Sequence, residues 1–374
     1  MKTILFIVQK EFRQIFRNKG MLPIIFVLPL IQLLILSNAA SFEVKNIAFS
    51  FVDNNHSEVS RALIQKFIAS DYFTIVDEFP SKKSALIEMQ KGTVDVILEI
   101  PTNFDKDLIK NKKAVVSVSI NAIDGATAGI TNVYISQILA IYNQSIQPQL
   151  FQYNEETFVQ PKSIVTIHSF WYNETLNYKT YMVPGILVLL VTMLTLFLSS
   201  MNIVREKEMG TLEQINVTPI KKYQFIIGKL FPFWVLGLVI LTVGLLIAKV
   251  IFNVPMLGNL GLIYLFTAVY LLVILGIGLF ISNFTETQQQ AMFIAWFFTV
   301  VFILMSGLFT PIESMPKWAQ NATLANPIRY FVEVMRMVLL KGAGLPDIKN
   351  HLLILFGYAF IINGLAVWSY KKTN

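Results

Sequence analysis

Residues 181–219 of this chain read "YMVPGILVLLVTMLTLFLSSMNIVREKEMGTLEQINVTP". Its first part is almost entirely apolar for about twenty residues, long enough to cross a hydrocarbon core about 30 Å thick as an α-helix. Four charged residues then stand in consecutive positions, Arg205 to Glu208, and Gly210 follows two residues later. The stretch therefore predicts a membrane-spanning helix that continues into a charged turn outside the bilayer.

The composition indicates that this span is one of several. The chain has 374 residues, of which 55% are hydrophobic and 14% charged, whereas a soluble domain carries roughly a quarter charged residues. The apolar runs lie at 21–38, 181–203, 224–251, 259–281, 290–309 and 350–370. We therefore predict a polytopic α-helical membrane protein with six transmembrane helices.

The N-terminal residues 1–20 predict an amphipathic helix that lies in the membrane interface. Its expected apolar face consists of Ile4, Leu5, Val8, Phe12, Ile15 and Phe16. Residues 21–40 are interpreted as transmembrane helix 1, an anchor that is not cleaved. Cleavage as a signal peptide after "LSNAAS" is the alternative, although its basic region would be unusually long.

Basic residues flank the spans on one side of the membrane, as cytoplasmic loops require. They are Lys2, Lys10, Arg13, Arg17 and Lys19, then Arg205, Lys207, Lys221 and Lys222, and finally Lys371 and Lys372. With six spans, this places both termini in the cytoplasm. The net charge of +7 then has a membrane explanation, and no nucleic-acid partner is expected.

The polar stretch 41–176 alternates between strand and helix patterns, which predicts an extracytoplasmic α/β domain between transmembrane helices 1 and 2. Strands are expected at 46–53, 72–79, 93–101 and 114–122, and helices at 57–70, 81–92, 102–112 and 126–146. The remainder, 177–374, carries transmembrane helices 2–6. It includes a cytoplasmic loop at 204–222 and two short outer helices within 310–348, starting near Pro316 and Pro327.

Catalytic and cofactor-binding signatures are absent from the sequence. "GKL" at 228–230 lacks the glycine spacing and the hydroxyl residue of a phosphate loop. There are no cysteines, and His56, His168 and His351 lack metal-ligand spacing, so no metal site is expected. The spans carry no charge at depth, because Lys229 lies near a cytoplasmic end and can snorkel, which disfavours an ion-coupled carrier.

Three groups of polar residues remain as candidate functional positions. One is a stripe along the second span, for which helix packing is favoured while a polar pathway or a dimer seam stays open. It consists of Thr192, Thr195, Ser199 and Asn202. The second group, Arg329, Glu333 and Arg336, has the spacing of ion pairs along one face of an outer helix.

The third group is the segment 205–219 itself. We expect Arg205–Glu208 to form a last helical turn that ends at Gly210, and a short transverse helix with Thr211 as N-cap to precede Pro219. A solvated connector is the simpler interpretation, but it would not need so many helix signals in fifteen residues. A cytoplasmic partner that grips this segment would move two spans at once.

Four motifs resemble the membrane subunits of type-2 ABC exporters. They are "EIPTNFDKDL" (99–108), "YMVPGIL" (181–187), "VREKEMGTLEQINVTPIKKYQFIIGKL" (204–230) and "LFTPIESMPKWAQNATLANPIRYFVEVMRMVLLKG" (308–342). Their order and topology extend the resemblance over essentially the whole chain. "YNETLNYKTY" (172–181) departs mildly from it, where the family often has Asn-Pro.

The resemblance implies a non-catalytic permease of the bacterial inner membrane that exports hydrophobic or amphipathic compounds, drugs and lipids among them. It implies a second permease chain, identical or a paralogue, and two cytoplasmic ATPase subunits that bind ATP and Mg. The residues that match the family's ATPase-coupling region are Arg205, Glu206, Lys207, Glu208, Gly210, Thr211, Glu213 and Pro219. Replacement of Glu206 or Glu208 by alanine is expected to uncouple ATP hydrolysis from export without unfolding the protein, and the N-terminal helix would also lie near the ATPase.

A different class of function also fits the sequence. The outer domain alone would act in a membrane-anchored envelope receptor or binding protein, whose spans serve only as anchors. The helix signals at 205–219 favour the permease, because an anchor has no use for a structured cytoplasmic helix. The substrate, and whether a periplasmic adaptor joins the outer domain, are left open.

Overall fold

The computed structural model describes residues 2–17, 21–39, 46–111, 113–150, 172, 177–211, 214, 218 and 220–370. The chain divides into a helical unit, Met1–Ser41 with His168–Asn374, and a second unit, Phe42–Ile167. Glu213, Pro219 and most of the transverse helix expected after Thr211 lie outside the described residues.

Long helices dominate the helical unit. Its elements are α1 (Lys2–Arg17), α2 (Met21–Ala39), α7 (Tyr178–Glu208), α9 (Lys222–Val250), α10 (Leu260–Asn283), α11 (Gln288–Leu304), η1 (Ile312–Ser314), α12 (Lys317–Thr323), α13 (Pro327–Lys341) and α14 (Leu345–Ser369). Within the described residues four of them, α7, α9, α10 and α14, are long and apolar enough to cross a membrane. These four match spans expected from the sequence.

The other two expected spans form shorter helices. α11 has 17 residues and ends at Leu304, five residues earlier than expected. The chain turns there through Ser306 and Gly307, and Gly307 has a positive φ of 77° that stops the helix. α2 has 19 residues and covers the first span expected from the sequence, 21–38.

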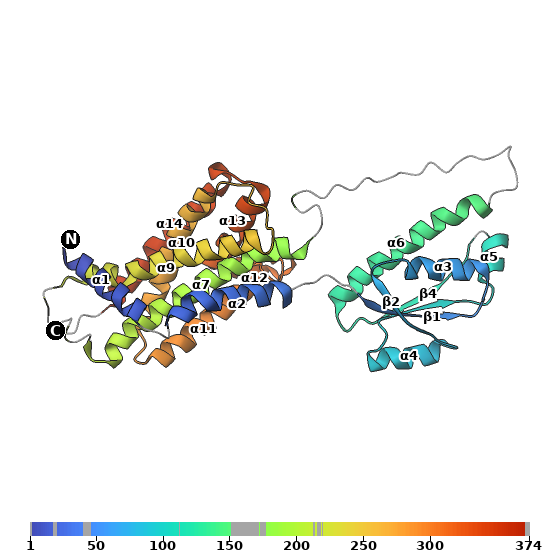
Figure 1. Ribbon diagram of the computed structural model, residues 1–374, viewed down its shortest axis with the longest axis horizontal. Helices are drawn as coiled ribbons and strands as arrows, with labels where there is room; N and C mark the ends of the chain where they lie inside the picture. Colours follow the sequence, from blue (N-terminus) through green and yellow to red (C-terminus); the bar gives the residue numbers. More distant parts are fainter. Residues whose placement is uncertain are drawn as a thin grey trace. The chain divides into compact units, whose positions relative to one another are not determined.

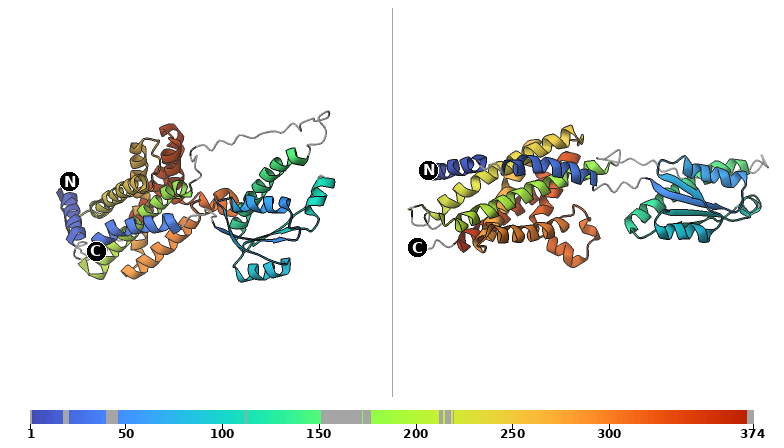
Figure 2. Two further views of the ribbon diagram at one scale, coloured as in Figure 1. Left: turned by 45° about the vertical axis from the view of Figure 1, so that its right-hand side comes forward. Right: turned by 60° about the horizontal axis from the view of Figure 1, so that its bottom comes forward.

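α7 is the central helix of this unit. In its most apolar stretch 89% of the residues are buried, whereas the corresponding figure for α14 is 17%. It packs against α2, α9, α10, α11 and α13, and the views in Figures 1 and 2 show it running among them. A displacement of α7 would therefore reach most of the unit.

The second unit is an α/β domain. Its elements are β1 (Ile47–Asp53), α3 (Glu58–Ile68), β2 (Phe73–Glu78), α4 (Lys82–Lys91), β3 (Val96–Ile100), α5 (Phe104–Lys110), β4 (Ser117–Ile120) and α6 (Gly125–Leu150). The sheet order is β2-β1-β3-β4, with β1 parallel to β2 and β3, and β4 antiparallel to β3. α4 covers one face, and α3, α5 and α6 cover the other (Figure 1). The expected alternation of strands and helices is confirmed.

Local signals set several boundaries as the sequence predicts. The Ser81 side chain accepts a hydrogen bond from the Ser84 amide at the start of α4, and Gly92 adopts the left-handed conformation that ends it. In the helical unit, Pro316 precedes α12 and Pro327 is the first residue of α13.

Phenylalanine side chains form the centre of the α/β core. Phe49 of β1 is fully buried, and its ring stacks on Phe67 of α3 with a centroid distance of 4.9 Å. Phe73 of β2 meets Phe49 edge-on at 5.7 Å. This cluster joins the first strand, the first crossover helix and the edge strand.

Truncation of this cluster tests the core. Phe49→Ala is expected to destabilise the α/β unit by about 3–5 kcal/mol, because it opens a cavity among tightly packed rings. Ile123→Ala, at a side chain that is 94% exposed, should leave stability nearly unchanged. Hydrogen exchange of the β1 amides in the full chain measures the stability of the α/β unit in each variant. Equal protection of these amides in the two variants would contradict the packing of this cluster.

Candidate functional site

The candidate site is the last turn of α7, where Arg205, Glu206, Lys207 and Glu208 follow one another. The helix ends at Glu208, and the next backbone amides still bond back into it: the Met209 amide donates to Arg205 O at 3.1 Å. Gly210 then takes a positive φ of 69°, which only glycine adopts at low cost. The four charged side chains thus leave a rigid turn in different directions.

Glu206 points into the protein. Its side chain is 2% exposed, and one carboxylate oxygen, Oε1, lies 2.7 Å from both Lys229 Nζ of α9 and Lys10 Nζ of α1. Its other oxygen accepts a hydrogen bond from the Thr211 hydroxyl. Glu206 therefore binds within the chain, because its carboxylate is buried between two ammonium groups of α1 and α9.

Glu11 completes a cluster of four charges with Lys10, Glu206 and Lys229. Glu11 is fully buried, and its Oε1 lies 2.9 Å from Lys229 Nζ, although without hydrogen-bond geometry. Asn202 donates to Glu11 Oε2 at 3.1 Å and accepts from Lys229 Nζ at 3.1 Å. Two cations and two anions leave this four-charge cluster neutral, so the buried charges compensate one another.

Lys10 is the member of the four-charge cluster that is partly open to solvent, with its side chain half exposed. Burial opposes its positive charge, but the hydrogen bond to Glu206 and the charge of Glu11 outweigh this effect. The pKa of Lys10 is therefore raised above its usual value, and the side chain stays charged at physiological pH.

The sequence interpretation missed Glu11 and misplaced Lys229. Lys229 was expected to snorkel to the interface, yet its side chain is 1% exposed. A signal for Glu11 existed, because it shares the apolar face of α1 with Ile4 and Ile15, at helical spacings of seven and four. An acid on such a face needs a buried partner of opposite charge.

Lys207 and Glu208 of the same turn bind neighbouring helix ends. Lys207 Nζ donates to backbone carbonyls at the end of α10, including Thr285 O at 3.0 Å. Glu208 accepts from the backbone amide of Gln288, the first residue of α11, at 2.7 Å, and also from its side chain. A cation at a helix C-terminus and an anion at an N-terminus both complement the helix dipole.

Arg205 borders a small cavity of about 140 Å³ together with Gln14, Asn202 and Gln288. The last turn of α7 therefore touches α1, α9, α10 and α11 through consecutive residues. We call this arrangement the α7 terminus. Glu208, Met209 and Gly210 are its exposed residues, so they form the surface that another molecule can reach.

The polar stripe of the second span is buried inside the chain. Thr192 bonds with the Tyr270 hydroxyl of α10, Ser199 donates to Leu196 O at 3.1 Å, and Asn202 belongs to the network just described. Thr195 is buried as well. The stripe packs against α9 and α10. This arrangement favours helix packing over a polar pathway or a dimer seam.

The outer residues do not pair with one another in the described part of the chain. Glu333 Oε2 lies 3.3 Å from His351 Nε2 of α14, and Arg329 donates to the Thr323 hydroxyl at the end of α12 at 2.6 Å. Arg336 lies over the Tyr181 ring at 3.7 Å and donates to Gly307 O at 3.2 Å. The expected ion pairs along α13 are wrong, because each side chain finds its partner on a neighbouring element.

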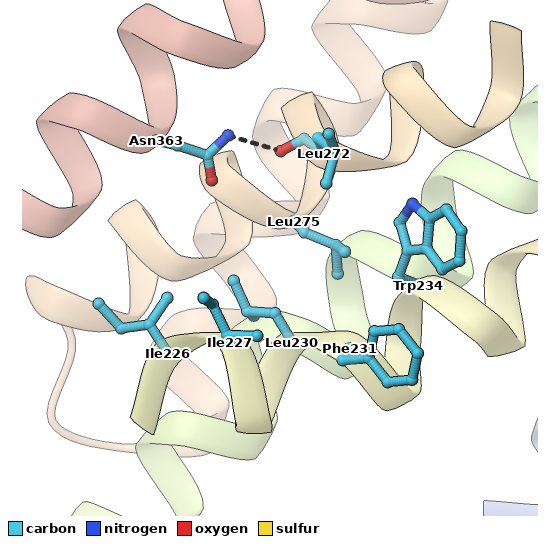
Figure 3. A pocket seen from close by; sticks show the side chains of 8 residues that line it. All are labelled: Ile226, Ile227, Leu230, Phe231, Trp234, Leu272, Leu275 and Asn363. Carbon is cyan, nitrogen blue, oxygen red and sulfur yellow. Dashed lines mark hydrogen bonds between the residues drawn. The ribbon is translucent and has the colours of Figure 1, made fainter. Parts of the chain in front are cut away.

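A second cavity, of about 310 Å³, lies between α9, α10 and α14 (Figure 3). Its lining is Ile226, Ile227, Leu230, Phe231, Trp234, Leu272, Leu275 and Asn363. The Asn363 amide donates to Leu272 O at 3.0 Å, and the Trp234 indole N–H donates to Ala268 O at 2.9 Å. The lining therefore presents apolar surface and no charged side chain.

The four-charge cluster predicts an asymmetry between single and double substitutions. Glu206→Leu and Lys229→Met are each expected to cost about 3–5 kcal/mol of stability, because each leaves a buried charge uncompensated. The double variant keeps the Lys10–Glu11 pair, 3.4 Å apart, and should recover most of the loss. Thermal unfolding of the purified chain followed by tryptophan fluorescence measures this. Losses that simply add in the double variant would contradict the cluster.

The crossing of α7 and α10 depends on a close approach at Gly278. A β-carbon there would lie 2.0 Å from Ser199 Oγ, so Gly278→Ala is expected to destabilise the chain by about 1–3 kcal/mol. Gly364→Ala in α14, where nothing lies within 4 Å, is the matched control and should be neutral or slightly stabilising. The same unfolding measurement applies, and equal behaviour of the two variants would show that the crossing tolerates the methyl group.

Known proteins resemble the chain over nearly its full length. The model of a family described as "ABC-2 family transporter protein" matches residues 19–368. The "Probable multidrug ABC transporter permease YbhR" of Escherichia coli (strain K12) is 30% identical over 92% of each chain. The "Inner membrane transport permease YhhJ" of the same strain is 23% identical, over 97% of this chain and 96% of that protein. The "Linearmycin resistance permease protein LnrN" of Bacillus subtilis (strain 168) is 21% identical, over 96% and 97%. This chain therefore belongs to the ABC-2 transporter family, as a membrane permease component that is not itself an enzyme.

Proposed function

We propose that this chain is the permease subunit of an ATP-driven exporter in a bacterial inner membrane. It crosses the membrane six times, through α2, α7, α9, α10, α11 and α14, with both termini in the cytoplasm and the α/β unit outside. It works with a second permease chain and with cytoplasmic ATPase subunits that bind ATP and Mg. Its cargo is hydrophobic or amphipathic and moves outward.

The observation that carries this proposal is the α7 terminus. Its consecutive charges bind α1 and α9 through Glu206, the end of α10 through Lys207 and the start of α11 through Glu208. A force applied to this one turn passes directly to four other helices. An export machine driven from the cytoplasm needs such a point, whereas a membrane anchor does not.

The contacts divide the coupling residues into two groups. Glu206 and Lys207 bind within the chain, so they transmit a displacement rather than receive it. Glu208, Met209 and Gly210 are exposed and supply the surface on which an ATPase would press. The roles proposed for Arg205, Thr211, Glu213 and Pro219 follow the family resemblance.

The cargo class is supported by the names of the relatives and by the apolar cavity. One relative is called a multidrug permease, and another a linearmycin resistance permease. The cavity between α9, α10 and α14 has no charged lining residue, which suits a hydrophobic compound better than an ionic one (Figure 3).

α11 is the element that best fits contact with the second permease chain. It buries only Ala291, Ala295 and Thr299, in a single line against its own chain. Large side chains such as Phe293, Trp296 and Phe297 are more than half exposed on the remainder of the helix. A wide aromatic surface of this kind packs well against another helix within the bilayer.

Purification from native membranes tests the proposal. The tagged chain, extracted in mild detergent, is expected to bring with it an ATPase that contains a phosphate-loop motif, identified by mass spectrometry. The ATPase should be lost when residues 205–213 are scrambled. Recovery with envelope proteins but without an ATPase, under conditions that preserve known transporter complexes, would favour the anchored receptor instead.

Glu208 provides the sharper prediction about coupling. Glu208→Ala is expected to reduce substrate-stimulated ATPase activity by about five-fold or more, the lower range of coupling between distant sites. Thermal stability should stay close to that of the unaltered chain, because the lost interaction is an exposed contact at the start of α11. The assay uses the reconstituted complex.

Glu88→Ala, which removes a partly exposed acid that pairs with Lys91 in the α/β unit, is the control and should leave coupling intact. If Glu208→Ala retained normal stimulation, the α7 terminus would not be the point at which the ATPase acts.

A further inference from the structure

α1 has two different faces, and the buried one binds its own chain. Ile15 and Glu11 are buried, Ile7 packs against Gly228 of α9, and Ile4 is half-buried. Much of the apolar face that the sequence assigned to the membrane therefore faces α9. The opposite side of α1 carries a different set of residues.

The opposite side is exposed along the whole helix. We call it the outer face of α1, and its residues are Lys2, Leu5, Phe6, Gln9, Lys10, Arg13, Phe16 and Arg17. They recur at spacings of three and four, so they form one continuous strip on the helix surface. This strip is the accessible part of α1.

The charge on the outer face has a single sign. Four of its residues are basic and none is acidic, since Glu11, the one acid in α1, lies in the four-charge cluster. Lys10 is bound to Glu206, whereas Lys2, Arg13 and Arg17 have no ion-pair partner among the described residues. Such a strip attracts an anionic surface.

Large apolar side chains interrupt this basic strip. Leu5 is 68% exposed, Phe6 67% and Phe16 55%. In an ordinary amphipathic helix, large apolar side chains such as these would lie on the buried side, which here faces α9. Aromatic and aliphatic side chains between basic ones are typical of helices that insert shallowly into lipid headgroups. A purely aqueous environment explains neither feature.

We propose that the outer face of α1 binds the anionic phospholipids of the cytoplasmic leaflet. The basic residues contact the phosphates, while Leu5, Phe6 and Phe16 reach the acyl boundary beneath them. Membrane lipid is favoured over a protein partner because α1 is followed within a few residues by α2. That argument relies on two parts of the proposed function, the membrane crossing of α2 and the cytoplasmic position of the N-terminus.

Lipid bound to this face would act on the α7 terminus. α1 contributes Lys10 and Glu11 to the four-charge cluster, where both lie near Lys229 or Glu206. When the outer face is seated on anionic headgroups, α1 becomes a fixed support for the last turn of α7. The lipid composition of the membrane would thereby tune how firmly that turn is held.

A single spin label tests the proposal in the full chain. The sequence contains no cysteine, so Gln9→Cys, at the middle of the outer face, gives one labelling site. The labelled chain is placed in nanodiscs of phosphatidylcholine alone or mixed with phosphatidylglycerol, without any ATPase. The nitroxide is expected to be shielded from a water-soluble relaxation agent in the anionic discs, and clearly less so in the neutral discs.

Removal of two basic side chains should abolish this difference. Each Lys or Arg near an anionic surface strengthens binding about five-fold, so Arg13→Gln with Arg17→Gln should weaken it about 25-fold. Lys249→Gln with Lys317→Gln, at exposed positions outside α1, is the matched control and should behave like the unaltered chain.

Two results would overturn the proposal. Equal accessibility of the label in both kinds of disc would show that anionic headgroups do not bind the outer face. Shielding that appears only after an ATPase is added would assign the face to a protein partner instead. Because the measurement needs neither ATPase nor cargo, it remains informative if the exporter proposal itself fails.

Discussion

The attraction between the buried carboxylates of Glu11 and Glu206 and the ammonium of Lys229 holds one end of the helical unit together. These groups come from α1, α7 and α9, and each is almost completely removed from solvent. Burying any one of them alone would be very costly, so the arrangement is favourable only when all are present. α1, α7 and α9 are thereby joined through charge as well as through packing.

α7 is held by polar contacts at both ends and by close packing between them. At one end its terminal charges bind four helices, and near the other end Arg336 of α13 covers Tyr181 and bonds to its carbonyl. In the middle, small and hydroxyl-bearing residues allow α10 to approach, as Ser199 does beside Gly278. Contacts thus fix α7 at both ends and along its middle.

The sequence predicted the elements well, because their signals are local. Ser81 and Gly92 mark both ends of one helix, and the alternation in the α/β unit depends on periods that a short window reveals. The premature end of α11 was missed, since the apolar run continues through a turn that depends on the backbone of Gly307. Hydrophobicity alone cannot distinguish a longer helix from a helix followed by an apolar turn.

The partners of the charges were much harder to predict. The run from Arg205 to Glu208 was recognised as special, but its contacts lie at Lys10, Thr285 and Gln288, far away in the sequence. A charge run next to a membrane span normally suggests a surface, and here most of it faces inward. Only an acid on an apolar helix face, Glu11, signalled in advance that some charges were buried.

The four-charge cluster also constrains how the chain is made. Glu11 leaves the ribosome long before Glu206 and Lys229, so its final partner in α9 does not yet exist when α1 reaches the membrane. Until α9 has been synthesised, Glu11 lacks its partner Lys229, and α1 cannot pack against α9. The four-charge cluster therefore assembles late in biogenesis, after Lys229 of α9 has been synthesised.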